Sequence, residues 1–262
     1  MEALAGRGGR GRPDPDADDG WTSEVSSGLA LAGFLALVFV GFTLLAMGPL
    51  MSLDAYFNLD APPAGWLPFL HVLDRIGQRA ICLPVLAVVT VVCCRHVRSW
   101  RPALVAGAAV FVLNLLVLTL KVTLGRGQPA AADPSFFVGG MAYPSGHTAN
   151  MVLVYGLAVY LLGHYRRIDR RVVTVLWSTV VLLSVVMVAT SLTLDWHWFA
   201  DLIAGLLVGG TVLQLSVAAD VATGRTLFDD GLRAVWRELR RRRRLPGRRP
   251  EPPAMLLGPG PP

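Results

Sequence analysis

Charged side chains are scarce in this sequence. Asp, Glu, Lys and Arg together make up 16% of its 262 residues, whereas hydrophobic residues make up 53%. A typical soluble domain has about 25% charged residues, so the mean hydropathy of +0.52 exceeds what the core of one soluble domain requires. The composition therefore indicates a chain for which the lipid bilayer is the main solvent.

Cysteine is also rare. Cys82, Cys93 and Cys94 lie in or beside apolar runs, without the spacing of a metal site and without extracytoplasmic partners for a disulfide framework. We therefore expect them to be buried apolar residues. No metal ion and no cofactor are predicted for this chain.

A secretory signal is missing as well. The first residues, MEALAGRGGRGRPDPDADDG, lack a positive region followed directly by an apolar core and a cleavage site, so no cleavage is expected. Glycine, proline and charge dominate this stretch, and we predict a disordered cytoplasmic tail over residues 1–27 and disorder again from about Leu245. The formal net charge of +6 does not indicate nucleic acid, because the basic residues cluster in short connections and in the C-terminal tail.

Long apolar runs are what the sequence does contain. A membrane-spanning helix needs roughly 20 apolar residues, because each residue advances about 1.5 Å across a hydrocarbon core of about 30 Å. The runs that qualify lie at 28–51, 80–94, 102–124, 147–162, 172–194 and 199–219. The second is short and would lengthen by starting near Ile76, at the cost of including Arg79. We predict an all-α, six-helix membrane domain over residues 28–222, followed by a basic cytoplasmic tail over 223–262.

The distribution of arginine orients these helices. One side collects the N-terminal GRGGRGR, the loop around Arg95 to Arg101, the segment 164–171 with four arginines, and the basic segment 233–249. Short basic loops stay in the cytoplasm, so we expect both termini there. Residues 52–79, 125–146 and 195–198 are then extracytoplasmic. The Ala, Arg and Gly bias favours a bacterial inner membrane.

Three polar stretches, far apart in sequence, are thereby brought to the extracytoplasmic face: KVTLGRGQP, YPSGHTAN and TSLTLDWHWFAD. The candidate site residues that they supply are Lys121, Arg126, Ser145, Gly146, His147, His197 and Asp201. In the second stretch, Ser145 can cap the following helix and Gly146 lets a ligand approach the backbone. Free amides at the helix start favour binding of a phosphate group.

The two histidines fit phosphate chemistry. His197 and Asp201 are four residues apart at a helix start, so the carboxylate can fix the tautomer of the ring and leave its other nitrogen to attack phosphorus. His147 can protonate the departing oxygen and later activate water. Lys121 and Arg126 would neutralise charge on the phosphate oxygens. A phosphohistidine intermediate is therefore expected.

These stretches resemble the signature blocks of the type 2 phosphatidic acid phosphatase family, K-x6-R-P, P-S-G-H and S-R-x5-H-x3-D. The resemblance spans 121–201 and keeps the spacing, with matches at Lys121, Pro129, the complete 144–147 block, His197 and Asp201. It implies a six-helix membrane fold with the active site at the extracytoplasmic ends of helices three to six. It also implies metal-independent phosphoester hydrolysis, with His197 as nucleophile and His147 as acid.

Two positions depart from the family pattern. Gln128 and Ser191 stand where the blocks have arginine, and neither reproduces the bidentate contacts of a guanidinium. Arg126 is expected to supply part of the missing charge. Asp195 would add negative charge beside the site unless it pairs with Arg126.

The function predicted is that of an integral membrane phosphatase acting on a lipid phosphate or a polyprenyl pyrophosphate. Phosphotransfer to an alcohol through the same intermediate stays open, as does a lipid-phosphate binding or transport protein with little turnover. An unrelated channel is disfavoured because the apolar runs carry almost no charge. Other predicted partners are the bilayer and, for the run RELRRRRRLPGRR, anionic lipid.

Overall fold

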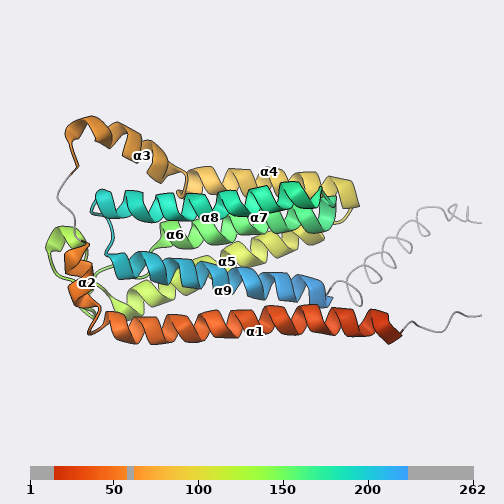
Figure 1. Cartoon of the computed structure of the whole chain (residues 1–262), viewed down its shortest axis with the longest axis horizontal. Coiled ribbons are helices and arrows are strands. Elements are labelled where there is room, and N and C mark those ends of the chain that lie inside the picture. The colour runs from red at the N-terminus through yellow and green to blue at the C-terminus, as the bar shows by residue number, and fades with distance from the viewer. Residues whose placement is uncertain (1–14, 58–61, 224–262) are drawn as a thin grey trace, which may run out of the picture. The chain divides into compact units, whose positions relative to one another are not determined.

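The computed structural model describes residues 15–57 and 62–223, and every regular element in this part of the chain is helical (Figure 1). The α-helices are α1 (Pro15–Ala46), α2 (Met51–Tyr56), α3 (Leu67–Arg75), α4 (Arg79–Val97), α5 (Arg101–Leu124), α6 (Gly146–Asn150), α7 (Gly156–Leu161), α8 (Arg170–Thr193) and α9 (Phe199–Thr223). Two π-helical turns, η3 (Met151–Tyr155) and η4 (Leu162–Arg166), make α6 and α7 part of one continuous stretch. The predicted all-α class is confirmed.

Within residues 15–57 and 62–223, six stretches are long and apolar enough to cross a membrane. They are Ser23–Ala46, Ala64–Val97, Arg101–Ala131, Gly146–Arg166, Arg170–Thr193 and Phe199–Thr223. Each corresponds to one of the predicted runs. The chain is therefore a multi-pass membrane protein, as predicted.

The first helix begins earlier than expected. Residues 15–27, predicted to belong to a disordered tail, form the first turns of α1, which starts at Pro15. Proline followed by acidic residues is a common helix start, because proline needs no amide partner there and carboxylates suit the positive end of the helix. Residues 1–14, the basic tail 224–262 and its predicted contact with anionic lipid lie outside the described residues.

The segment before α4 also differs from the prediction. It was expected to be a loop, yet it contains α3, which starts with a proline in its first turn and buries Leu70 and Asp74. Nine residues are too few to span a bilayer, so the search for long apolar runs passed over this helix. A short non-helical elbow, residues 76–78, joins α3 to α4 at Arg79, and this elbow becomes important for the site.

The continuous stretch from α6 to η4 is the most enclosed of the spanning helices. Inside the described part of the chain, 61% of its apolar window is buried, against 17% for the windows of α1 and α8. Helix α4 packs against both α5 and α7, and α7 packs against α8, so this central stretch is surrounded on several sides (Figure 1). The residues that begin it, Gly146 and His147, are therefore held in position by the surrounding helices.

Glycines bring α9 into direct contact with α6. A Cβ atom at Gly205 would lie 2.1 Å from Thr148 Oγ1, and one at Gly209 would lie 2.5 Å from the carbonyl oxygen of Ala149. Only a residue without a side chain permits such an approach between two helices. The Ser145 amide also donates to the Asp201 carbonyl at 2.9 Å. The second and third sequence blocks are thereby fixed against each other.

Candidate active site

A cavity of about 690 Å³ opens where the three sequence blocks meet. It is lined by side chains from the start of α4, the end of α5, the start of α6 and the turn before α9. The lining residues are Gly77, Gln78, Arg79, Ala80, Lys121, Gln128, Ala130, Met141, Gly146, His147, Asn150, Asp195, Trp196 and His197. Lys121, Gly146, His147 and His197, all predicted site residues, therefore share one cavity. Ser145, Asp201 and Arg126 do not line it.

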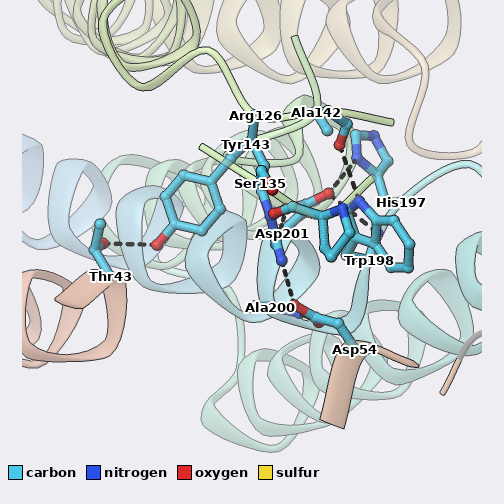
Figure 2. Close-up of polar contacts among 12 residues, drawn as sticks. Thr43, Asp54, Arg126, Ser135, Ala142, Tyr143, His197, Trp198, Ala200 and Asp201 are labelled. Atoms are coloured by element: carbon cyan, nitrogen blue, oxygen red, sulfur yellow. Dashed lines mark hydrogen bonds and ion pairs between the residues drawn. The ribbon is translucent and has the colours of Figure 1, made fainter. Parts of the chain in front are cut away.

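His197 is paired with Asp201 directly behind the cavity wall. Its Nδ1 lies 3.4 Å from Asp201 Oδ2 (Figure 2). The carboxylate is completely buried and also accepts a hydrogen bond from the backbone amide of Trp198 at 3.0 Å. Because Nδ1 faces the carboxylate, Nε2 is on the opposite side of the ring, and this is the arrangement that an oriented nucleophile requires.

Arg126 lies deeper than predicted, inside the protein. Its side chain has no exposed surface, and its guanidinium is ion-paired with Asp201 Oδ1 at 2.6 Å and with Asp54 Oδ2 (Figure 2). Its Nε donates to the Pro134 carbonyl at 2.9 Å. A guanidinium held by two buried carboxylates is not available to a substrate in the cavity. The structure thus places Arg126 as an internal anchor instead of a phosphate ligand.

The backbone at the end of α5 explains this placement. Helix α5 ends at Leu124, and Gly125 takes the left-handed conformation at φ 49°, so the chain turns away from the helix axis just before Arg126. Aromatic rings then enclose the guanidinium, with the Phe136 centroid 4.8 Å and the Trp198 centroid 5.8 Å from its central carbon. Lys121, one turn earlier, stays on the cavity side and donates to the carbonyls of Met141 and Ala142.

Asp54 completes the anchor from a segment that the sequence blocks do not include. Its Oδ1 accepts from the Ala200 amide at 2.8 Å, and burial raises the pKa of its carboxyl group. The sequence did not predict a role for Asp54, because a single acidic residue in a short helix forms no recognisable pattern. Nearby, the hydroxyl of Tyr143 lies 2.6 Å from Thr43 Oγ1, and burial raises the pKa of this phenol to about 12. The loop before α6 is therefore attached to α1 by a neutral hydrogen bond.

His147 has a carboxylate of its own. Its Nε2 lies 3.9 Å from Asp74 Oδ2, and its ring centroid is 6.4 Å from that of His197. Asp74 is fully buried on α3, accepts from Gln78 Nε2 at 2.8 Å, and has one oxygen, Oδ1, with no hydrogen-bond partner among the described residues. Sequence reasoning missed Asp74. A buried acid in a mostly apolar segment was the available signal.

Ser145 and Gly146 form the start of the central helix. Ser145 occupies the N-cap position of α6, but its side chain makes no capping hydrogen bond, and its buried Oγ has no partner in the part of the chain that the structure describes. A Cβ atom at Gly146 would meet nothing within 4 Å. The backbone there faces open cavity, so the prediction that a ligand approaches at this glycine fits the geometry.

The two positions that depart from the family pattern have different surroundings. Gln128 lines the cavity, whereas Ser191 is buried on α8 with its Oγ 3.6 Å from Met187 Sδ. Asp195 also lines the cavity, and burial raises the pKa of its carboxyl group. The ion pairs of Arg126 are with Asp54 and Asp201 and do not include Asp195.

Comparisons with known proteins found one family model and one solved structure to which this chain is similar. The family model described as "PAP2 superfamily" matches residues 102–224. A solved structure, described as the first transmembrane PAP2 type phosphatidylglycerolphosphate phosphatase from Bacillus subtilis, superposes with a TM-score of 0.63 at 20% sequence identity. The alignment covers 75% of this chain and 98% of that one. No curated protein matches the chain. The match of residues 102–224 to the PAP2 superfamily model and the shared transmembrane fold both agree with the resemblance predicted from the three sequence blocks.

Proposed function

We propose that this protein is a membrane phosphatase that hydrolyses a lipid phosphate or a polyprenyl pyrophosphate through a phosphohistidine intermediate. The observation that carries the proposal is the position of His197. Its Nδ1 faces the buried carboxylate of Asp201, while its ring lines a cavity shared with His147 and Lys121. A nucleophile, an orienting carboxylate, a proton donor and a cation are thus within one small volume.

The reaction follows from these positions. The phosphate binds at Gly146 with its charge balanced by Lys121, and Nε2 of His197 attacks phosphorus. The bond from phosphorus to the lipid oxygen breaks as His147 gives that oxygen a proton. His147 then takes a proton from water, which attacks the phosphohistidine and releases phosphate and free His197. Asp74 would orient His147 through both steps.

A lipid substrate fits the location of the cavity. The lining residues lie at the last turn of α5, the first turn of α6 and the turn before α9, at ends of membrane-spanning helices. A headgroup can reach such a site while its tail stays between lipid chains. The opposite helix ends carry Arg95, Arg98, Arg166 and Arg167. Since basic loops are retained in the cytoplasm, we propose that the cavity is extracytoplasmic.

The test is phosphate release by the detergent-purified protein from a panel of lipid monophosphates and pyrophosphates in the presence of a chelator. We expect release by the wild type and a loss of about 10⁴-fold or more in His197→Ala, because the nucleophile is removed. His147→Ala should also be severely impaired. His96→Ala, an exposed histidine at the other ends of the helices, is the matched control and should keep full activity.

Acid-labile phosphate on the protein gives an independent readout. Rapid quenching in base should trap phosphohistidine in the wild type and none in His197→Ala. Release that persists in His197→Ala would refute the proposed nucleophile. Phosphate binding without release from any lipid would instead favour a lipid-phosphate binding protein, and an alcohol that captures the phosphoryl group would reveal a transferase.

A further inference from the structure

The elbow between α3 and α4 is packed tightly against the active-site helix. A Cβ atom at Gly77 would lie 2.6 Å from Met187 Cε and 3.4 Å from the carbonyl oxygen of His147. The hydroxyl of Tyr155 donates to the Ile76 carbonyl at 2.9 Å. The backbone just before α4 is therefore fixed beside His147. The first side chain of α4 consequently lies at the cavity.

That side chain is Arg79. It lines the cavity together with Lys121, His147 and His197, and it is exposed. The structure records no ion pair for it with any residue of 15–57 or 62–223. Arg126 is occupied by Asp54 and Asp201, so among the cavity-lining residues that the structure describes Arg79 is the only guanidinium. The cavity is thus lined by a guanidinium without an ion-pair partner in the described part of the chain, in addition to the ammonium group of Lys121.

The helix that Arg79 begins adds to this charge. Gly77, Gln78, Arg79 and Ala80 all line the cavity, and α4 continues for 19 residues. The amides of Ile81 and Cys82 donate to the Gln78 carbonyl, while those of Arg79 and Ala80 have no acceptor within the helix, as at any helix start. The positive end of the α4 dipole therefore faces the same space as the guanidinium.

Position 191 is connected to this elbow through Met187. Ser191 Oγ lies 3.6 Å from Met187 Sδ, and Met187 Cε is the atom that a Cβ at Gly77 would strike. The small side chain of Ser191 and the flexible side chain of Met187 leave room for the elbow to pack against α8. A larger basic side chain at position 191 would need part of the space that the elbow fills. The second departure from the family pattern, Gln128, lies in the cavity wall and carries no charge.

We infer that Arg79 binds the substrate phosphate, and that it supplies from the N-terminal half of the chain the guanidinium that Gln128 and Ser191 do not. This inference rests on the proposed function of the same site. Arg79 lies outside residues 102–224, the part that matches the PAP2 superfamily model. In this protein the phosphate clamp is thus built from two separate regions of the sequence.

The experiment compares Arg79→Ala, Arg79→Lys and the matched control Arg75→Ala in the full-length protein. Arg75 is an exposed arginine four residues earlier, at the end of α3, and does not line the cavity. We expect kcat/KM to fall by about 10²–10³-fold in Arg79→Ala, as for removal of one oxyanion donor, and to be unchanged in Arg75→Ala. Arg79→Lys should recover only part, because an ammonium cannot make the bidentate contact.

A second variant and a binding measurement separate this inference from the proposed function. Gln128→Arg in the Arg79→Ala background should restore at least part of the lost kcat/KM. Titration with orthovanadate, followed by protection against thermal unfolding, reports anion binding even if no lipid is hydrolysed. The inference is overturned if Arg79→Ala binds vanadate as the wild type does, or if its kcat/KM is within twofold of wild type while His197→Ala is inactive. Failure of the wild type to release phosphate would count against the proposed function alone.

Discussion

Each of the two histidines that line the cavity has a buried carboxylate partner, and the two carboxylates differ in how firmly they are held. Asp201 accepts from Arg126 and from the Trp198 amide besides facing His197 at 3.4 Å. Asp74 accepts from Gln78 and faces His147 at the longer distance of 3.9 Å, with one oxygen unpartnered in the described part of the chain. A nucleophile must be aimed in one direction, whereas an acid that later acts as a base benefits from freedom to move between two oxygens. The difference between the pairs therefore matches the roles proposed for them.

The largest expected effect comes from removing the anchor of the firmer pair. Arg126→Ala leaves the carboxylates of Asp54 and Asp201 buried without a counter-charge, and breaking a buried ion pair in this way costs about 3–5 kcal/mol. We expect a clearly lower unfolding temperature in detergent, together with loss of activity. Lys121→Ala is the contrasting variant, since it should lose activity but keep the wild-type unfolding temperature. A folded, equally stable Arg126→Ala protein with only a raised KM would restore the prediction that Arg126 binds phosphate.

The second prediction separates the two carboxylates by their chemistry. Asp74→Asn should lower kcat by about 10–100-fold on an alkyl phosphate, because a neutral amide no longer attracts the protonated ring of His147 3.9 Å away. On p-nitrophenyl phosphate the loss should be much smaller, because nitrophenolate departs without needing a proton. Asp201→Asn, which disturbs the nucleophile, should lose activity on both substrates alike. Equal losses for Asp74→Asn on the two substrates would mean that Asp74 does not act through the acid.

The smallest expected effect concerns Asp195, whose side chain lines the cavity. Burial raises the pKa of its carboxyl group, so this group takes up a proton at a higher pH than an ordinary aspartate as the solution is acidified. Above that pH its negative charge opposes an anionic substrate. Asp195→Asn should therefore lower KM by about 2–5-fold at neutral pH, the effect of one partly screened charge. The difference in KM between variant and wild type should vanish on acidification, and a constant difference would exclude titration of Asp195 as the cause.

The sequence anticipated much of the fold and part of the site. The apolar runs and the block spacing predicted the spanning helices and the meeting of Lys121, His147 and His197, because bilayer thickness and helix periodicity leave few other arrangements. Short helices such as α3 were not predicted, since an apolar run of nine residues is too short to indicate a membrane-spanning helix. Because α3 was not predicted, Asp74 was not recognised as a site residue. Arg79 follows the elbow after α3, and the sequence indicated it only as a charge that a longer second helix would have to include.

The sequence by itself determined that this chain is a helical membrane protein and which histidines face a common surface. Only the tertiary structure decided which arginine is buried in ion pairs and which one lines the cavity. Arg126 and Arg79 carry the same group, yet one is buried between two carboxylates and the other lines a cavity. A guanidinium is stabilised by whatever opposite charge the fold brings within a few ångströms, and here the partners of Arg126 come from α2 and α9, far away in sequence. No local pattern contains that information.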